Sequence, residues 1–168
     1  MRRNLYLRHA VILVVEHTVK GSWGIQINFP HTSASNLGSI IQNQGLWSDL
    51  EQPVYFGGQH HVQRCFILHS NDWSSETTLS ITDDISLSGD MYILSAISAG
   101  QGPKYIRPVI GLHQWGAGEL DTEIQQSADS GWLVCNPSIR LIFDYEGDTQ
   151  WQKVLAQATK SIVDQIWN

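Results

Sequence analysis

Two adjoining strand-like segments near the start of the chain, residues 9–17 and 22–30, restrict the fold more than any other feature of the sequence. The first, HAVILVVEH, is a continuous run rich in β-branched residues, which is typical of a strand buried on both faces. In the second, SWGIQINFP, apolar and polar residues alternate, so we expect a half-buried strand that ends at Pro30. The short turn TVKG between them predicts a hairpin, and therefore a fold that contains antiparallel sheet.

The rest of the chain alternates between further strand and helix patterns. Strands are predicted over residues 53–58, 62–69, 76–82, 104–113 and 132–136, and helices over 33–45, 88–100, 116–128 and 149–167. Ser88 and Gly116 are the predicted N-caps of two helices, and Thr149 with Gln152 forms a capping box in the amphipathic C-terminal helix. Pro108 restricts its strand to a sheet edge or a bulge. Helices mixed with antiparallel hairpins predict the α+β class.

Trp115 stands one residue before the predicted cap Gly116 and five before Leu120, which is the spacing of a hydrophobic staple. Glu119 occupies the third position of the same predicted helix, where a glutamate can bind the backbone of the cap. The start of this helix is therefore the best marked in the sequence.

Length and composition indicate a single globular domain over residues 1–168. With 42% hydrophobic and 15% charged residues, the chain is far from the composition of disordered proteins. Its 10 basic and 16 acidic residues give a net charge of −6. Nucleic-acid affinity depends on clustered Lys and Arg, so this acidic chain argues against DNA or RNA as a partner.

Apolar runs and cysteines indicate where the protein resides. The apolar run 10–15 is much shorter than the ~20 residues that span a bilayer. Arg8 and His9 interrupt the apolar start of the chain, which argues against a signal peptide. A cytoplasmic protein without a membrane segment is expected. Cys65 and Cys135 both lie in apolar, strand-like runs, which indicates buried free thiols in a reducing compartment.

The segment GGQHHVQRCFILHS, residues 57–70, concentrates histidine and cysteine and raises the question of a metal site. Zinc needs ligands that converge at about 2.0–2.3 Å from one ion. His61, Cys65 and His69 follow one another at intervals of four, and four residues of a strand span about 13 Å. We therefore expect no metal and no cofactor. The preceding glycines indicate a tight turn or a close backbone approach, because no helix pattern and no suitably placed lysine follow them.

Three sets of residues, in this order, carry a family resemblance: VVEH with G.WGIQINFP, then PVYFGGQ with R.FILH, then GLHQWGAGELDTEI with GWL. Together they resemble the AlgH/YqgE family of bacterial proteins over nearly the whole chain, from about residue 7 to 143. The resemblance implies a single α+β domain with a coiled, branching β-sheet and no agreed biochemical activity. Some members are labelled transcriptional regulators, a label to which the acidic charge of this chain adds no physical support.

Matching motif to motif brings a set of residues into view: Glu16, His17, Gly24, Asn28, Pro30, Gly57, Gly58, His69, Gly111, Trp115, Gly118, Glu123 and Trp132. The chain departs from the family pattern in several places. Val15 replaces a frequent cysteine, Gln59 replaces a proline, and Leu112 with His113 and Gln114 replaces the central Tyr-x-Gly/Ala. Family members usually carry an additional apolar segment before the position of Leu7, so the N-terminal segment is expected to be shortened.

Two classes of function remain open. The first is a module that binds a small molecule or a protein, or that regulates one, through a cleft formed by Glu16, His17, Asn28, Gly57, Gly58, His69, Trp115 and Glu123. The alternative is a hydrolase or transferase in which His17 or His69 is the general base and Glu16 or Glu123 orients it. No G-x-S-x-G motif and no activated cysteine identifies a nucleophile, which favours the non-enzymatic interpretation. Each residue taken singly also fits a structural role.

A homodimer is the last expectation. The apolar strand at 10–15 has one neighbour in its hairpin, and an uncovered second edge would invite association. We expect a two-fold dimer with residues 5–11 at or beside the contact. Alternatively, an internal strand covers that edge and the chain is monomeric.

Overall fold

The structure, a computed structural model, describes residues 7–31, 52–126 and 131–167. The helix predicted over 33–45 lies outside these residues. The elements in chain order are β1 Ile12–Thr18, β2 Gly21–Gln26, β3 Tyr55–Phe56, β4 His60–Ser70, β5 Leu79–Ser80, β6 Ile85–Ser88, α2 Met91–Ser98, β7 Ile106–Gly116, α3 Glu119–Gln125, α5 Ile139–Phe143 and α6 Gly147–Trp167.

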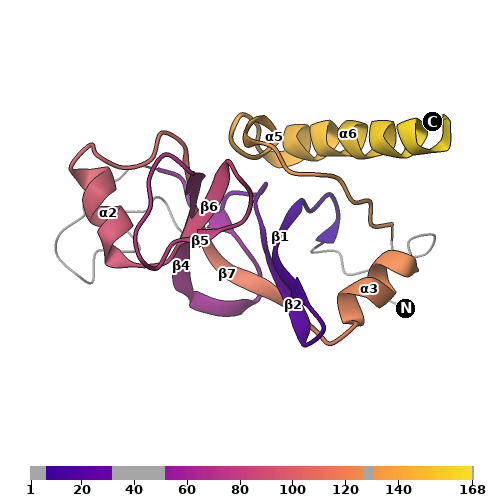
Figure 1. Ribbon diagram of the computed structural model, residues 1–168, viewed down its shortest axis with the longest axis horizontal. Coiled ribbons are helices and arrows are strands. Elements are labelled where there is room, and N and C mark those ends of the chain that lie inside the picture. The colour runs from indigo at the N-terminus through magenta and orange to yellow at the C-terminus, as the bar shows by residue number, and fades with distance from the viewer. Residues whose placement is uncertain (1–6, 32–51, 127–130, 168) are drawn as a thin grey trace.

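The described strands form one seven-stranded sheet with the order β1-β2-β7-β4-β6-β5, and β3 pairs with β7 in parallel. All the other pairings are antiparallel, so the sheet is mixed, and it curls into a half-barrel. In Figure 1, α6 runs along one side of the sheet, α2 lies at its opposite end, and α3 lies near the ends of β2 and β7. The α+β class with a C-terminal helix is therefore confirmed.

The β1–β2 hairpin is confirmed, with Leu13 opposite Ile25 and Thr18 opposite Gly21. The predicted burial of these strands is wrong. Among the described strands β1 is the last in the sheet, and Val14 is 37% exposed because one face of β1 reaches solvent. In β2 both faces are buried, since Ser22 is as inaccessible as the core side chains. Strand hydropathy does not report which elements cover a face.

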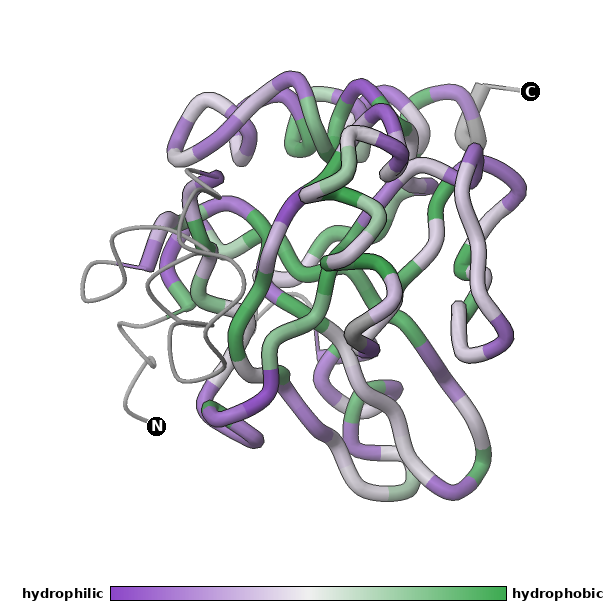
Figure 2. The backbone as a smooth tube through the Cα atoms, turned by 90° about the vertical axis from the view of Figure 1, so that its left-hand side faces the viewer, coloured by the Kyte–Doolittle hydropathy of each residue, from purple (hydrophilic) through white to green (hydrophobic). Residues whose placement is uncertain are grey.

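The core lies between the sheet and the helices that flank it. Its larger cluster joins Leu13 and Ile25 of the hairpin to Val109 of β7, with Ile142 of α5 packed against them. A smaller cluster joins β4 and β7 to α2 through Ile93. Figure 2 shows hydrophobic segments converging on the middle of the molecule, while hydrophilic segments occupy many of the outer loops.

Two predicted N-caps are wrong by two residues. Ser88 is the last residue of β6, a strand that the sequence patterns did not predict, and Asp90 caps α2 by accepting from the amides of Tyr92 and Ile93. Helix α3 begins after Gly118, which has φ 72°, a left-handed conformation that favours glycine. The predicted hydrogen bond between Glu119 and the backbone of Gly116 is nevertheless present, because Oε2 of Glu119 accepts from the Gly116 amide at 2.6 Å.

The C-terminal region departs further from the predictions. Helix α6 begins at Gly147, so Thr149 does not cap it, and its buried face includes Gln150 as well as Ala158. Helix α5 had no counterpart among the predicted elements. Residues 132–136, predicted as a strand, pair with no described strand. Short segments such as these take their structure from tertiary contacts more than from local pattern.

Pro108 was predicted to lie at an edge or a bulge, yet β7 is a central strand flanked by β2, β3 and β4. The prediction of an edge strand or a bulge is therefore wrong, and the surrounding register explains how a central strand accepts the proline. Among the described strands, Pro108 is registered only with Ile67 of β4, so its missing amide hydrogen interrupts no ladder on the other side. In the described part of the chain, no helix is long and apolar enough to cross a membrane.

Candidate functional site

His17, Ser22 and Trp115 lie side by side across three neighbouring strands. Ser22 of β2 is directly opposite His17 of β1 and directly opposite Trp115 of β7. Directly opposite residues of antiparallel strands project from the same face of a sheet. The three side chains therefore form a row, and α3 contacts β2 and β7 at this end of the sheet.

His17 makes one hydrogen bond through its ring and lies beside one carboxylate. Its Nδ1 is hydrogen-bonded to the Ser22 hydroxyl at 2.6 Å, and its Nε2 lies 3.3 Å from Oδ1 of Asp121 on α3. The negative carboxylate favours a proton on Nε2, because it attracts an N–H and repels a nitrogen lone pair. In the neutral ring Nδ1 is then an acceptor, and the Ser22 hydroxyl donates to it. The side chains of His17 and Asp121 are about half exposed, whereas Ser22 is only 7% exposed.

Glu123, two residues further along α3, accepts hydrogen bonds from two indole rings. Its Oε2 accepts from Nε1 of Trp115 at 3.3 Å and from Nε1 of Trp132 at 3.2 Å. These bonds connect the end of β7 to the chain that follows α3. We call the six residues His17, Ser22, Trp115, Asp121, Glu123 and Trp132 the hairpin cluster. It unites three of the residues predicted for the cleft: His17, Trp115 and Glu123.

Glu16 is adjacent to His17 in sequence but faces the other side of the sheet. It is opposite Trp23, whose Nε1 donates to Glu16 Oε2 at 3.0 Å. The Trp23 ring in turn lies 6.1 Å from that of Phe66. Glu16 therefore does not orient His17; among the described carboxylates, Asp121 takes that position.

His69 is completely buried and far from the hairpin cluster along the sheet. It is opposite Ile106, nine positions before Trp115 on β7, which corresponds to about 30 Å of extended strand. Its Nδ1 lies 2.8 Å from the Ser70 carbonyl and its Nε2 lies 3.0 Å from the Ser88 hydroxyl. Burial lowers the pKa of His69, against smaller opposing contributions from the Ser70 carbonyl, Asp72 and Asp90. These contacts give His69 a structural role.

Asn28 is also fully buried, and its side chain connects the first strands to α6. Oδ1 accepts from the Val11 amide at 3.0 Å, while Nδ2 donates to the carbonyls of His9 at 2.8 Å and Gly147 at 3.2 Å. Every polar atom of this side chain is thus used inside the protein.

Gly57 and Gly58 allow a close approach of backbones, as their spacing predicted. The Gly57 carbonyl accepts from the Gln26 amide, and its amide donates to the Ile110 carbonyl, so Gly57 bridges β2 and β7. A Cβ at Gly57 would lie 2.2 Å from the Gly111 carbonyl oxygen, and one at Gly58 would lie 2.2 Å from the Leu112 carbonyl carbon. Only glycine fits at these two positions.

Neither cysteine is activated as a nucleophile. Burial raises the pKa of Cys65 to about 12 and raises that of Cys135, which keeps both thiols protonated at neutral pH. Both are free cysteines. Within the described ranges, no three or more His, Cys, Asp or Glu side chains converge as a metal site requires.

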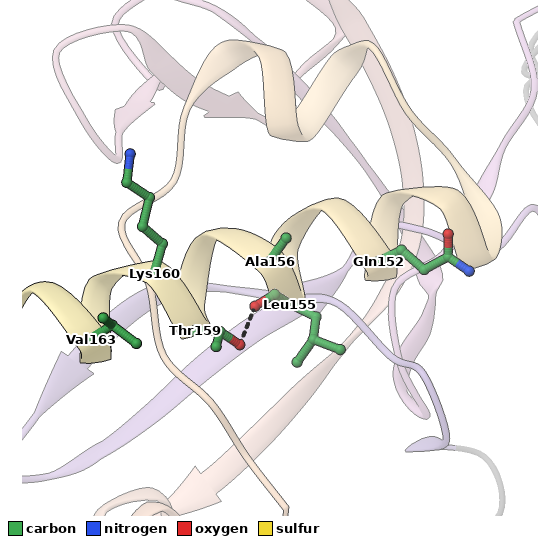
Figure 3. Close-up of a pocket in the computed structure, with 6 residues that line it drawn as sticks. All are labelled: Gln152, Leu155, Ala156, Thr159, Lys160 and Val163. Atoms are coloured by element: carbon green, nitrogen blue, oxygen red, sulfur yellow. Dashed lines mark hydrogen bonds between the residues drawn. The ribbon is translucent and has the colours of Figure 1, made fainter.

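A shallow hollow lies on α6, away from all of these residues. It is lined by Gln152, Leu155, Ala156, Thr159, Lys160 and Val163, and Figure 3 shows all six on the same helix. The Thr159 hydroxyl donates to the Leu155 carbonyl at 2.8 Å, a bond within the helix. None of the residues predicted for the cleft borders this hollow.

Sequence reasoning missed two members of the hairpin cluster, Ser22 and Asp121. The signal for Ser22 was present, because a four-residue turn at 18–21 places residue 22 opposite residue 17. Asp121 has no such signal in the sequence, because its approach to His17 of β1 depends on the packing of α3. Trp132 was matched to a motif but was not included in the cleft.

The curled, mainly antiparallel sheet and its flanking helices define an α+β half-barrel protein with a polar, tryptophan-containing cluster at one end. The profile of the AlgH-like family matches residues 3–162, and the chain belongs to that family. A UPF0301 protein of Marinomonas sp. strain MWYL1 is 37% identical over 151 residues, which cover 87% of this chain and 77% of that protein. A UPF0301 protein of Methylococcus capsulatus is 34% identical over 152 residues, covering 89% and 81%.

Solved structures agree with this assignment. The solution structure of the AlgH protein from Pseudomonas aeruginosa has a TM-score of 0.77 and 27% identity, covering 94% of this chain and 82% of that chain. The crystal structure of DIP2367 from Corynebacterium diphtheriae has a TM-score of 0.63 at 17% identity, covering 86% and 75%, and shares the fold. These matches establish family and fold, and they assign no reaction or ligand.

Proposed function

We propose that the protein is a binding or regulatory module that recognises a small molecule or another protein at the hairpin cluster. The observation that carries this proposal is the convergence of His17, Trp115 and Glu123 at one end of the sheet. They come from β1, β7 and α3, and the carboxylate of Asp121 beside them is about half exposed. Half-exposed polar groups beside aromatic rings are typical of recognition sites.

The remaining motif residues support the same conclusion by their roles. Asn28 and His69 are completely buried and fully engaged, and Gly57 and Gly58 serve backbone packing. An enzyme would be favoured if Glu16, His17 and His69 surrounded one concave site. They are instead distributed over both faces and along the length of the sheet.

A hydrolase or transferase is the second candidate, and the order Asp121–His17–Ser22 favours it. A carboxylate that keeps Nε2 protonated leaves Nδ1 free to take the proton of a serine hydroxyl, as in nucleophilic catalysis. Ser22 Oγ would then add to an acyl carbonyl while its proton moves to Nδ1. The tetrahedral intermediate would expel its leaving group, which takes that proton from Nδ1 and leaves an ester on Ser22. The burial of Ser22 between β1 and β7 weighs against this candidate, because a substrate must reach Oγ.

A ligand screen read by tryptophan fluorescence tests the first proposal, since Trp115 and Trp132 belong to the cluster. A compound that binds should lose at least tenfold in affinity with His17→Gln and remain unchanged with His60→Gln, an exposed histidine of β4. Hits that bind both variants equally would place recognition elsewhere.

The second candidate is tested by labelling with an organophosphonate that reacts with activated serines. Mass spectrometry showing modification of Ser22, lost with His17→Gln, would establish catalysis. An unlabelled Ser22 in the folded protein leaves the binding function as the sole proposal.

A further inference from the structure

Residues 132–136, WLVCN, run between α3 and α5, outside every described helix and strand (Figure 1). Their N–H and C=O groups make no hydrogen bond with any other described residue, although the Trp132 ring is anchored to Glu123. Two apolar side chains of the segment face solvent: Leu133 is 45% exposed and Val134 is 62% exposed. The next residue, Pro137, cannot donate a hydrogen bond and ends the run.

A segment of this kind is a template for strand addition. Rows of unpaired donors and acceptors beside apolar side chains pair readily with another extended chain. The local sequence supports strand formation, since it was predicted as a strand from its residues alone. What is missing among the described residues is a neighbouring strand.

Both edges of the described sheet are protected, because the edge strand β5 is only two residues long and β1 carries several devices against pairing. A bulge between Val14 and Glu16 breaks the register of β1, and Glu16 and His17 place polar groups along it. Bulges and charges are the usual devices that prevent edge-to-edge association. The segment 132–136 contains no charged residue, and it is paired with none of the described strands. It therefore lacks both of these protective devices.

We propose that residues 132–136 pair with the same segment of a second copy of this chain, antiparallel and about a two-fold axis. The chain carries a net charge of −6, so most of its surface repels a copy of itself, whereas this segment meets its copy without like charges. Pairing centred on Val134 places Val134 opposite Val134 of the partner subunit and gives each segment hydrogen bonds along the side that faces its partner. An isologous contact of this kind closes at the dimer.

Sedimentation and light scattering of the full chain at increasing micromolar concentration test the proposal. The mass should rise from 18.9 kDa to twice that value. Val134→Lys places two like charges opposite each other and should return the protein to the monomer at the same concentrations. Val62→Lys, a matched change at an exposed valine of β4, should leave the dimer intact.

Amide hydrogen exchange provides a second readout that a general effect on solubility would not move. Exchange of every second amide in residues 132–136 should slow as the dimer forms and remain fast in Val134→Lys. A chain that stays at 18.9 kDa, a dimer that survives Val134→Lys, or a dimer lost equally in both variants would each overturn the proposal.

Discussion

Asp121 Oδ1 lies 3.3 Å from Nε2 of His17, so α3 meets the exposed end of β1 through a carboxylate and an imidazole. The same ring reaches Ser22 through Nδ1. His17 thereby connects three elements, β1, β2 and α3, and its protonation pattern follows from the groups on either side. The sequence predicted that Glu16 or Glu123 orients His17. In the structure the carboxylate beside His17 is that of Asp121.

We expect neutral His17 to carry its proton on Nε2. Nitrogen-15 NMR of the imidazole distinguishes the two tautomers directly. Asp121→Ala removes the carboxylate beside Nε2. The tautomer population of neutral His17 should then shift toward the Nδ1-protonated form. Glu16→Gln is the matched control, because Glu16 faces the opposite side of the sheet and bonds Trp23. An equal response to both changes would contradict the geometry described for the hairpin cluster.

Trp115→Ala should lower the free energy of unfolding by about 2 kcal/mol, near the low end for removal of a large side chain, because the ring is half-buried. The change removes ring packing and the bond to Glu123. Trp115→Phe retains an aromatic ring but no N–H, and should cost about 1 kcal/mol. Urea denaturation measures both. An unchanged midpoint in Trp115→Ala would instead identify the ring as an exposed recognition surface.

The β1–β2 hairpin could be predicted because its signals are local. Continuous and alternating hydropathy with a short turn between them specify two paired strands, and the register follows from the turn length. Burial could not be predicted, since it depends on what packs over each face. Val14 and Ser22 illustrate this, as an apolar residue is exposed and a polar one is buried.

The candidate site was predicted in part for the same reason. His17, Trp115 and Glu123 were identified from motifs, but a motif does not reveal which residues converge. His69 was included in the predicted cleft because of its residue type and motif. The strand order and register of the sheet, which the motif does not reveal, place it far from His17. Helix α5 and strand β6 are too short to leave a periodic pattern.

Arg107 is a buried cation whose loss should uncouple α6 from the sheet. Its Nη1 donates to the Ile27 carbonyl at 2.5 Å and to Gln150 Oε1 at 2.8 Å. Its Nη2 donates to the Tyr145 carbonyl at 2.8 Å. The guanidinium also lies 4.4 Å from the centre of the Tyr55 ring. Desolvation lowers the pKa of Arg107, yet an arginine remains charged at neutral pH.

Arg107→Lys keeps the charge but cannot reproduce this fork of donors, and should destabilise the protein by about 3 kcal/mol. Denaturation followed by the fluorescence of Trp151 on α6 would report the change where it arises. Arg140→Lys is the control, since Arg140 is mainly exposed and its pair with Asp144 contributes less than about 1 kcal/mol. Equal effects of the two substitutions would contradict the role assigned to Arg107.

His69 should make the fold sensitive to acid. Its pKa is lowered in the folded protein, first of all by burial, while the unfolded chain has the ordinary value near 6.5. The unfolded state therefore binds a proton more readily, and stability falls as the pH decreases below about 6.5. The loss grows until the pH reaches the lowered folded value. Asp72 and Asp90 are the nearby carboxylates that oppose this shift.

His69→Gln provides the test, because an amide can donate to Ser70 and accept from Ser88 but does not titrate. The variant should be less stable than the parent at neutral pH, and its stability should decline less steeply between pH 6.5 and 5. Urea denaturation at a series of pH values measures the slope. His61→Gln removes an exposed histidine from the same strand and should leave the slope unchanged. If His69→Gln retained the full acid dependence, the sensitivity would have to arise from other groups.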